Sequence, residues 1–246
     1  MGWPATTRRC AALLILLAAA FAPAEVAAQP ADLPATVSTL AGRSEVLPAG
    51  ASTWIPAKLL PPDRSTSPDQ SKERLGSEVD AGASARVPGA GRMALRTPSG
   101  HALRIGSFSQ IQLVGAAAAG AEEPLRVKLL AGRLWVAVSP VAGPRPRVAV
   151  DAGPVMVSVR GSGVSLRMDR DGSVLVRVYH GAAVAAGTAG GATWERPLKG
   201  GEELVVPATG APGPPRALSR ESHEEIWVRW NEEQDAAGYG GPMPPR

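Results

Sequence analysis

Histidines, serines and carboxylates are the side chains of this sequence that can do chemistry, and their spacing assembles no reactive centre. His101, His180 and His223 are scattered singles without a partner at ligand spacing, whereas zinc needs three or four converging ligands. A nucleophilic serine of the Gly-x-Ser-x-Gly type lies on a turn between a strand and a helix, and Gly161-Ser162-Gly163 is only a fragment of that pattern. We therefore expect no catalytic residue, no metal site and no cofactor.

Two carboxylates precede a glycine in the segment Asp169-Arg170-Asp171-Gly172. The same order begins a calcium loop, but such a loop needs further ligands and a distal glutamate, and Ser173 is followed here by apolar residues. An Asp-Gly pair is typical of tight β-hairpins. The segment therefore predicts a hairpin turn rather than a calcium site.

A candidate recognition turn is formed by Arg160, Gly161 and Ser162. The structural interpretation of the same residues is that Gly161 and Gly163 allow a bulge or a tight bend, while Arg160 covers the surface of a sheet. We prefer the structural interpretation, and we keep the turn as the candidate site of this region.

The elements around that turn are predicted by apolar residues that alternate with polar ones. Such alternation marks the runs 155–159, 164–168 and 174–178, and a period of two over β-branched residues indicates half-buried strands. Residues 125–129 and 132–138 are predicted as two further strands joined near Ala131 and Gly132. With about a dozen such runs at short spacing, the fold class is all-β, with many short antiparallel strands in a sandwich, a barrel or a solenoid-like arrangement.

One α-helix is predicted after the last strand, over residues 222–237. Ser222 and Glu225 form a capping box, and Glu225 is placed to pair with Arg229 four residues later. Ile226, Trp227 and Trp230 share one side of this helix. They are the candidate residues for docking a partner, and the alternative is that they pack the helix on the protein's own sheet.

The domain organisation follows from composition. Residues 1–28 combine two arginines, a short apolar core and small residues, which is the pattern of a cleaved secretory signal peptide. We expect a flexible leader at 29–35, an all-β domain at 36–206 with an exposed loop at 61–72, a Pro/Gly linker at 207–221 and a disordered tail at 238–246. The protein is thus expected in the periplasm or outside the cell, with no stable membrane span after cleavage of the signal.

The net charge of +4 does not indicate nucleic-acid binding. That function needs a clustered basic patch, usually with aromatic residues, whereas the cations here are dispersed along the strands. They alternate with valine and leucine, which predicts a solvated strand face made of Arg126, Lys128, Arg133, Arg167 and Arg177.

Six segments, in order, resemble the FecR domain family of bacterial envelope proteins. The matching segments, which together span about residues 40–210, are 75–87, 96–113, 129–136 (Leu-Leu-Ala-Gly-Arg-Leu-Trp-Val), 150–163, 174–181 and 200–202. The chain departs from the family pattern where a Thr-Pro pair is replaced by the segment from Asp151 to Pro154. It departs again where Arg-Gly-Thr becomes Arg160-Gly161-Ser162.

The resemblance implies an all-β domain of the cell envelope. The best-known family members are transmembrane sigma regulators, but only ten residues precede the apolar core here, so we do not expect direct control of a sigma factor. The expected function is that of an exported, non-catalytic binding module whose partner is an envelope protein or polysaccharide. Two alternatives stay open, a structural component of an envelope assembly and a glycan-acting hydrolase whose paired carboxylates meet only in space.

Overall fold

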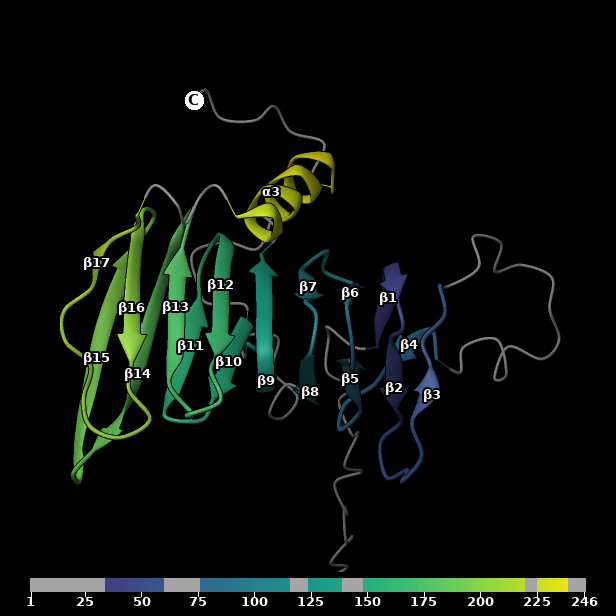
Figure 1. Cartoon of the computed structure of the whole chain (residues 1–246), viewed down its shortest axis with the longest axis horizontal. Helices are drawn as coiled ribbons and strands as arrows, with labels where there is room; N and C mark the ends of the chain where they lie inside the picture. Colours follow the sequence, from purple (N-terminus) through teal and green to yellow (C-terminus); the bar gives the residue numbers. More distant parts are fainter. Residues whose placement is uncertain (1–33, 60–75, 116–123, 139–147, 220–224, 239–246) are drawn as a thin grey trace, which may run out of the picture.

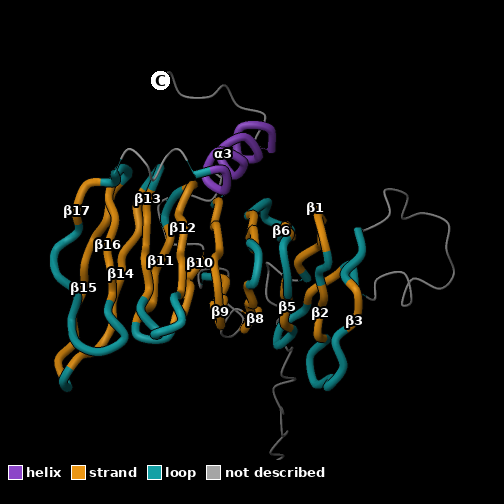
Figure 2. The backbone as a smooth tube through the Cα atoms, viewed as in Figure 1, coloured by secondary structure: helices purple, strands orange, loops and turns teal. Residues whose placement is uncertain are grey.

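The computed structural model describes residues 34–59, 76–115, 124–138, 148–219 and 225–238. Nearly all of its regular structure is strand (Figure 2), and the strands form two layers that share one hydrophobic core. Chain order runs along the long axis of the molecule, so the first strands and the last strands lie at opposite ends (Figure 1). The prediction of an all-β fold with one C-terminal helix is confirmed, and the sheet is not closed into a barrel.

We call the layer that contacts the helix the helix layer and the other the opposite layer. The helix layer contains, in spatial order, β4 (Glu78–Val79), β1 (Ala35–Gly42), β6 (Gly91–Arg96), β7 (Ala102–Ile105), part of β9 (Leu125–Ala137), β12 (Ser162–Met168), β13 (Val174–Val178), β16 (Glu202–Val206) and β17 (Arg216–Ala217). The opposite layer contains, in the same direction, β3 (Ile55–Pro56), β2 (Glu45–Leu47), β5 (Ser84–Val87), β8 (Ser109–Gly115), the rest of β9, β10 (Val148–Ala152), β11 (Val155–Val159), β14 (Ala182–Ala189) and β15 (Ala192–Lys199).

Strand β9 belongs to both layers. Its first half pairs with β8 and, in parallel, with β10, whereas its second half pairs with β7 and β12. The change of layer occurs near Gly132, which has a φ of 76°. A Cβ atom at this position would lie 2.2 Å from Ser109 Oγ. The prediction of two separate strands here is therefore corrected to one continuous strand, because glycine bends the backbone without ending it.

The three alternating runs form β11, β12 and β13, and their valines and Leu166 lie in the core between the layers. The hairpin between β12 and β13 closes with hydrogen bonds from Gly172 N to Asp169 O and from Asp169 N to Ser173 O, and Gly172 adopts a φ of 82°. This geometry is a three-residue loop with a left-handed glycine. The two carboxylates of the predicted turn thus lie in a hairpin.

The helix α3 (Ile226–Gly238) is placed across the ends of the central strands of the helix layer (Figure 1). The proposed capping residue Ser222 lies outside the described residues, as do the predicted signal peptide, the exposed loop at 61–72 and the tail after residue 238. The described part of the predicted linker includes β17. Among the described residues, no helix is long and apolar enough to cross a membrane.

Candidate functional site

A second hydrophobic cluster lies on the outer surface of the helix layer, under α3. Trp135 and Tyr179 stack there with ring centroids 5.1 Å apart, and Val228 of the helix is buried against the same cluster together with Ala102 and Ala137. Trp135 alternates with Leu134 and Val136, which point into the main core. β9 is therefore buried on both faces at this point, and α3 supplies the second cover.

Polar groups also hold the helix on this cluster, which we call the helix seat. Arg104 Nη1 donates to Asp235 Oδ1 at 2.5 Å, and Trp135 Nε1 donates to the other carboxylate oxygen at 3.0 Å. The Arg104 side chain is 4% exposed and that of Asp235 is 12% exposed. Burial raises the pKa of Asp235 above its usual value, although the guanidinium of Arg104 acts in the other direction. The loss of hydration thus outweighs the attraction within this buried pair.

A row of charges crosses the helix layer next to the seat. Arg177 donates to Glu203 at 2.9 Å and to Glu225, just before α3, at 2.7 Å. Burial opposes the charged form of Arg177, but the bonds to Glu225 and Glu203 raise its pKa, so that it stays charged. Glu203 also accepts a hydrogen bond from Arg216 at 2.7 Å. These contacts join β13, β16 and β17 to the start of the helix.

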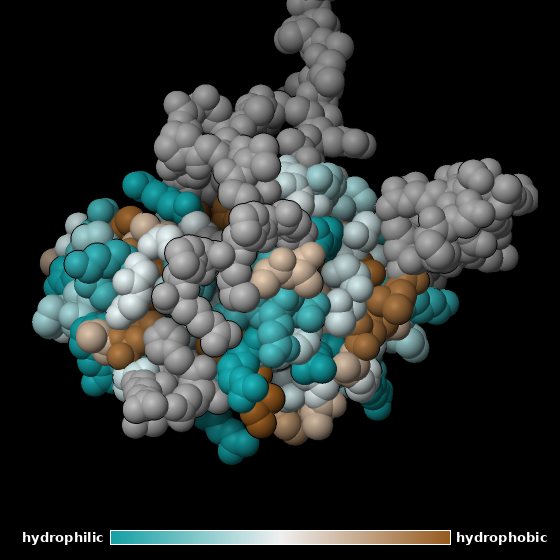
Figure 3. Space-filling view, turned by 90° about the horizontal axis from the view of Figure 1, so that it is seen from above, coloured by the Kyte–Doolittle hydropathy of each residue, from teal (hydrophilic) through white to brown (hydrophobic). Residues whose placement is uncertain are grey.

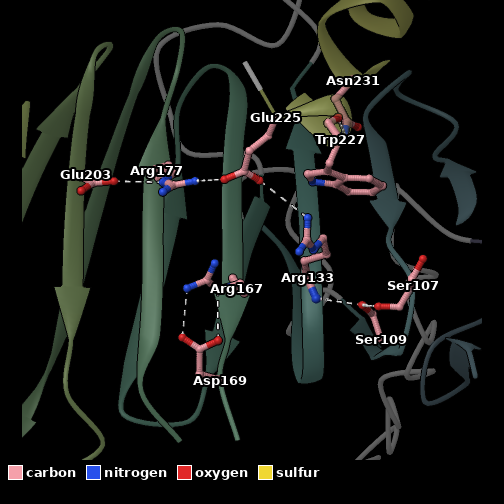
Figure 4. Close-up of polar contacts among 10 residues, drawn as sticks. All are labelled: Ser107, Ser109, Arg133, Arg167, Asp169, Arg177, Glu203, Glu225, Trp227 and Asn231. Atoms are coloured by element: carbon pink, nitrogen blue, oxygen red, sulfur yellow. Dashed lines mark hydrogen bonds and ion pairs between the residues drawn. The ribbon is translucent and has the colours of Figure 1, made fainter. Parts of the chain in front are cut away.

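A small hollow opens between this row and the start of α3. Arg133, Arg167 and Arg177 line it together with Ser165, Glu225 and Trp227, and Figure 4 shows these arginines on neighbouring strands. Tyr179 also lines the hollow, and burial raises its pKa to about 12. Its phenol therefore remains neutral at physiological pH, and the charge of the hollow is set by the arginines and by Glu225.

The structure places the predicted recognition turn away from this hollow. Arg160 is exposed between β11 and β12, and its backbone N–H donates to Ala182 O at 2.9 Å. Gly161 lies so close to the chain that a Cβ atom would be 2.7 Å from Gly181 Cα. The pairing of β12 with β9 shifts register between Ser162 and Val164, which is the bulge expected of this glycine-rich segment. The recognition role of this turn stays a prediction.

The three candidate residues of the helix have different surroundings. Ile226 is 82% exposed, so it does not pack on the sheet. Trp227 is partly buried against the second cluster, and Trp230 lies 5.6 Å from it between ring centroids. The guanidinium of Arg92 lies over the Trp230 ring at 4.4 Å. The helix thus uses Val228 and Trp227 for packing and leaves Ile226 at the surface.

The arginines of this region have surroundings that their alternation with apolar residues did not predict. Arg133, Arg167 and Arg177 were expected on a solvated face, and they instead line the hollow, each with a carboxylate within 4.0 Å. The carboxylate expected to pair with Arg229 is directed to Arg177 and Arg133. The apolar stretch around Trp135 was the sequence feature that indicated this site. A strand without alternation is buried on both faces, so another element must pack on its outer face.

The surface around the site is mixed in polarity. Seen from the side of the helix, hydrophobic residues form small patches separated by hydrophilic ones (Figure 3). Within the described ranges, no group of three or more histidine, cysteine, aspartate or glutamate residues is placed to hold a metal ion. His180 lies 3.5 Å from Glu232 of α3, so one of the scattered histidines contacts the helix.

Comparison with known proteins identifies the central part of the chain. The family model described as FecR protein matches residues 83–184, and no curated protein matches the sequence. Two crystal structures of a protein described as a "putative anti-sigma factor" from Parabacteroides distasonis ATCC 8503, at 1.65 Å and 2.50 Å resolution, are similar with a TM-score of 0.43 and 14% identity. Each match covers 56% of this chain and 61% of the other, so this chain spans about three fifths of the length of those structures. The segment matched by the FecR protein model, residues 83–184, contains β9 and its neighbours in both layers, and over this segment the chain is similar to the FecR family.

Proposed function

We propose that the protein is an exported, non-catalytic binding module of the bacterial cell envelope, acting in signalling or sensing. The FecR domain over residues 83–184 supports the signalling or sensing class. The side chains that converge on the helix layer support binding, because they are arginines, glutamates and aromatic rings. Arginine, tryptophan and tyrosine are the residues enriched where proteins recognise partners.

The observation that carries the proposal is the surface at the start of α3. Ile226 is exposed next to Trp227 and Trp230, and Arg92 lies over the second of these rings. An exposed isoleucine beside a pair of tryptophans is an apolar anchor with a polar border, which is the composition of a recognition patch. The helix is held by buried polar bonds, so the patch is presented by a fixed element.

A capture experiment with a matched control tests this proposal. The purified protein is immobilised and exposed to solubilised membrane and cell-wall fractions, and Ile226→Asp is compared with Val205→Asp. Both residues are exposed, at 82% and 47%, but Val205 lies on β16 away from the helix. We expect one defined component that is captured by the wild type and by Val205→Asp and is lost with Ile226→Asp.

Two results would contradict the proposal. Equal capture by both variants would exclude the start of α3 as the binding surface. Turnover of cell-wall material by the purified protein would favour the glycan-acting hydrolase instead. Export has its own measurement, the intact mass of the protein recovered outside the cytoplasm, which should lack residues 1–28.

A further inference from the structure

The pairing register of the strands places three positively charged arginines together at the hollow beside α3. Arg133 of β9 lies directly opposite Arg167 of β12, and Ser165 of β12 lies opposite Arg177 of β13. Side chains directly opposite on neighbouring antiparallel strands contact one another, and like charges in these positions are destabilising. The arrangement therefore has an electrostatic cost that must be offset by negative charge.

Carboxylates from neighbouring segments offset that cost, and Glu203 bonds Arg177 at 2.9 Å. Asp169 pairs with Arg167 at 3.0 Å from the hairpin side. Glu225 contacts Arg177 at 2.7 Å but Arg133 at only 3.8 Å, which is beyond hydrogen-bond distance. In Figure 4, Asp169 lies beside Arg167, whereas Glu225 lies between Arg177 and Arg133. The lining of the hollow thus contains three arginines and one glutamate.

A buried donor without an acceptor lies in the same place. Trp227 Nε1 is buried and has no hydrogen-bond partner within the part of the chain that the structure describes. Figure 4 shows this nitrogen on the side of the ring that faces Glu225 and Arg133. An unsatisfied buried N–H destabilises a protein, and native structures contain few of them. The lining therefore presents three guanidinium groups and an indole N–H without an acceptor against one carboxylate, that of Glu225.

We propose that this hollow binds one oxyanion group, a carboxylate or a phosphate, of the ligand recognised by the module. Arg133 and Arg167 would donate to its oxygens from two sides, and Trp227 Nε1 and the Ser165 hydroxyl would complete the contacts. Guanidinium groups suit this role because their planar donors match the oxygens of carboxylate and phosphate. The inference rests on the proposed binding function and adds the chemistry of the ligand to it.

Titration of the indole resonances by NMR tests the site directly. The ¹⁵N-labelled protein is titrated with inorganic phosphate and with D-glucuronate, with D-glucose as the neutral control and at constant ionic strength. The Trp227 signal is assigned by its loss in Trp227→Phe. We expect a saturable shift of this signal with at least one anion and none with glucose, and the preferred anion distinguishes a phosphate-bearing from a carboxylate-bearing source.

Charge-removing variants complete the test. Arg133→Gln and Arg167→Gln should each weaken the apparent affinity by about tenfold or more, because each removes a charge-assisted hydrogen bond. Arg126→Gln is the matched control, because Arg126 is an exposed arginine of the first half of β9 that does not line the hollow. It should change the affinity less than about twofold.

Absence of a saturable shift with either anion would overturn the inference. Shifts that persist unchanged in Arg133→Gln and Arg167→Gln would overturn it as well. Both variants alter partly exposed side chains, and unchanged thermal melting confirms that they fold. If these results overturn the inference but an envelope component is still captured in an Ile226-dependent way, the proposed function stands without it.

Discussion

Removal of the Asp235 carboxylate is the perturbation whose outcome depends most directly on the helix seat. In Asp235→Leu, Arg104, whose side chain is 4% exposed in the wild type, loses its counter-charge, and the Trp135 N–H loses its acceptor. Breaking a buried pair from one side costs about 3–5 kcal/mol. Undocking of α3 would let water reach Arg104 and limits this cost, so we expect a loss of about 3 kcal/mol in the free energy of unfolding.

The assay is urea unfolding followed by tryptophan fluorescence, because Trp135 and Trp227 lie in the seat. With a dependence on urea of about 3 kcal/mol per molar, the midpoint should fall by about 1 M. Arg104→Leu should cost a similar amount. The double variant Arg104→Leu/Asp235→Leu should recover at least about 2 kcal/mol relative to the sum of the single variants, because the two charges are then removed together.

Two outcomes would refute this reasoning. A cost below about 1 kcal/mol for Asp235→Leu would mean that the pair behaves as a surface salt bridge. Additive costs in the double variant would mean that Arg104 and Asp235 act separately. Asp235→Asn is the informative intermediate, since it keeps an acceptor for Trp135 Nε1 while it removes the charge.

Two further predictions concern the backbone of β9 and the N-terminal charges. Gly132→Ala should lower the free energy of unfolding by about 2 kcal/mol or more, because a positive φ adds to a clash with Ser109. Gly190 also has a positive φ, but no atom would contact a Cβ there, so Gly190→Ala should cost only about 1 kcal/mol. Equal costs in the two urea titrations would contradict the steric account. Hydrogen bonds from Arg43 and then Arg86 lower the pKa of Glu45 below 4.5, so its stabilising contribution should be present above that pH and lost as the pH falls through the lowered pKa. The difference in unfolding free energy between wild type and Glu45→Gln should therefore shrink on acidification, and a difference that grows would show that the sign is wrong.

Local patterns in the sequence predict the strands and turns well. Alternating valines in 155–159 and 174–178 mark β11 and β13, because a half-buried strand needs one apolar face. The Asp-Gly pair marks the hairpin, since the closing residue adopts a left-handed conformation that glycine favours. These features depend on neighbours within a few residues, so the chain itself contains the information.

The candidate site was not predicted because its contacts join distant segments. Arg177 and Glu225 are 48 residues apart, and Arg104 and Asp235 are 131 residues apart. The type of each residue is visible in the sequence, but the pairing register that places Arg133 opposite Arg167 is not. The same lack of long-range information made β9 read as two strands, because a glycine at a change of layer is indistinguishable by sequence from a glycine in a turn.

The position of β9 in both layers has a consequence for the order in which the protein folds. Among the described residues, no strand before β9 pairs directly with a strand after it, and the two segments are joined because both pair with β9. As the chain emerges from the ribosome, β7 and β8 therefore expose open edges until residues 125–137 are available to cover both. Exposed edges invite pairing with other chains. An interruption of synthesis before residue 125 should consequently leave a fragment prone to aggregation, whereas one after residue 137 should leave an N-terminal half with these two edges covered.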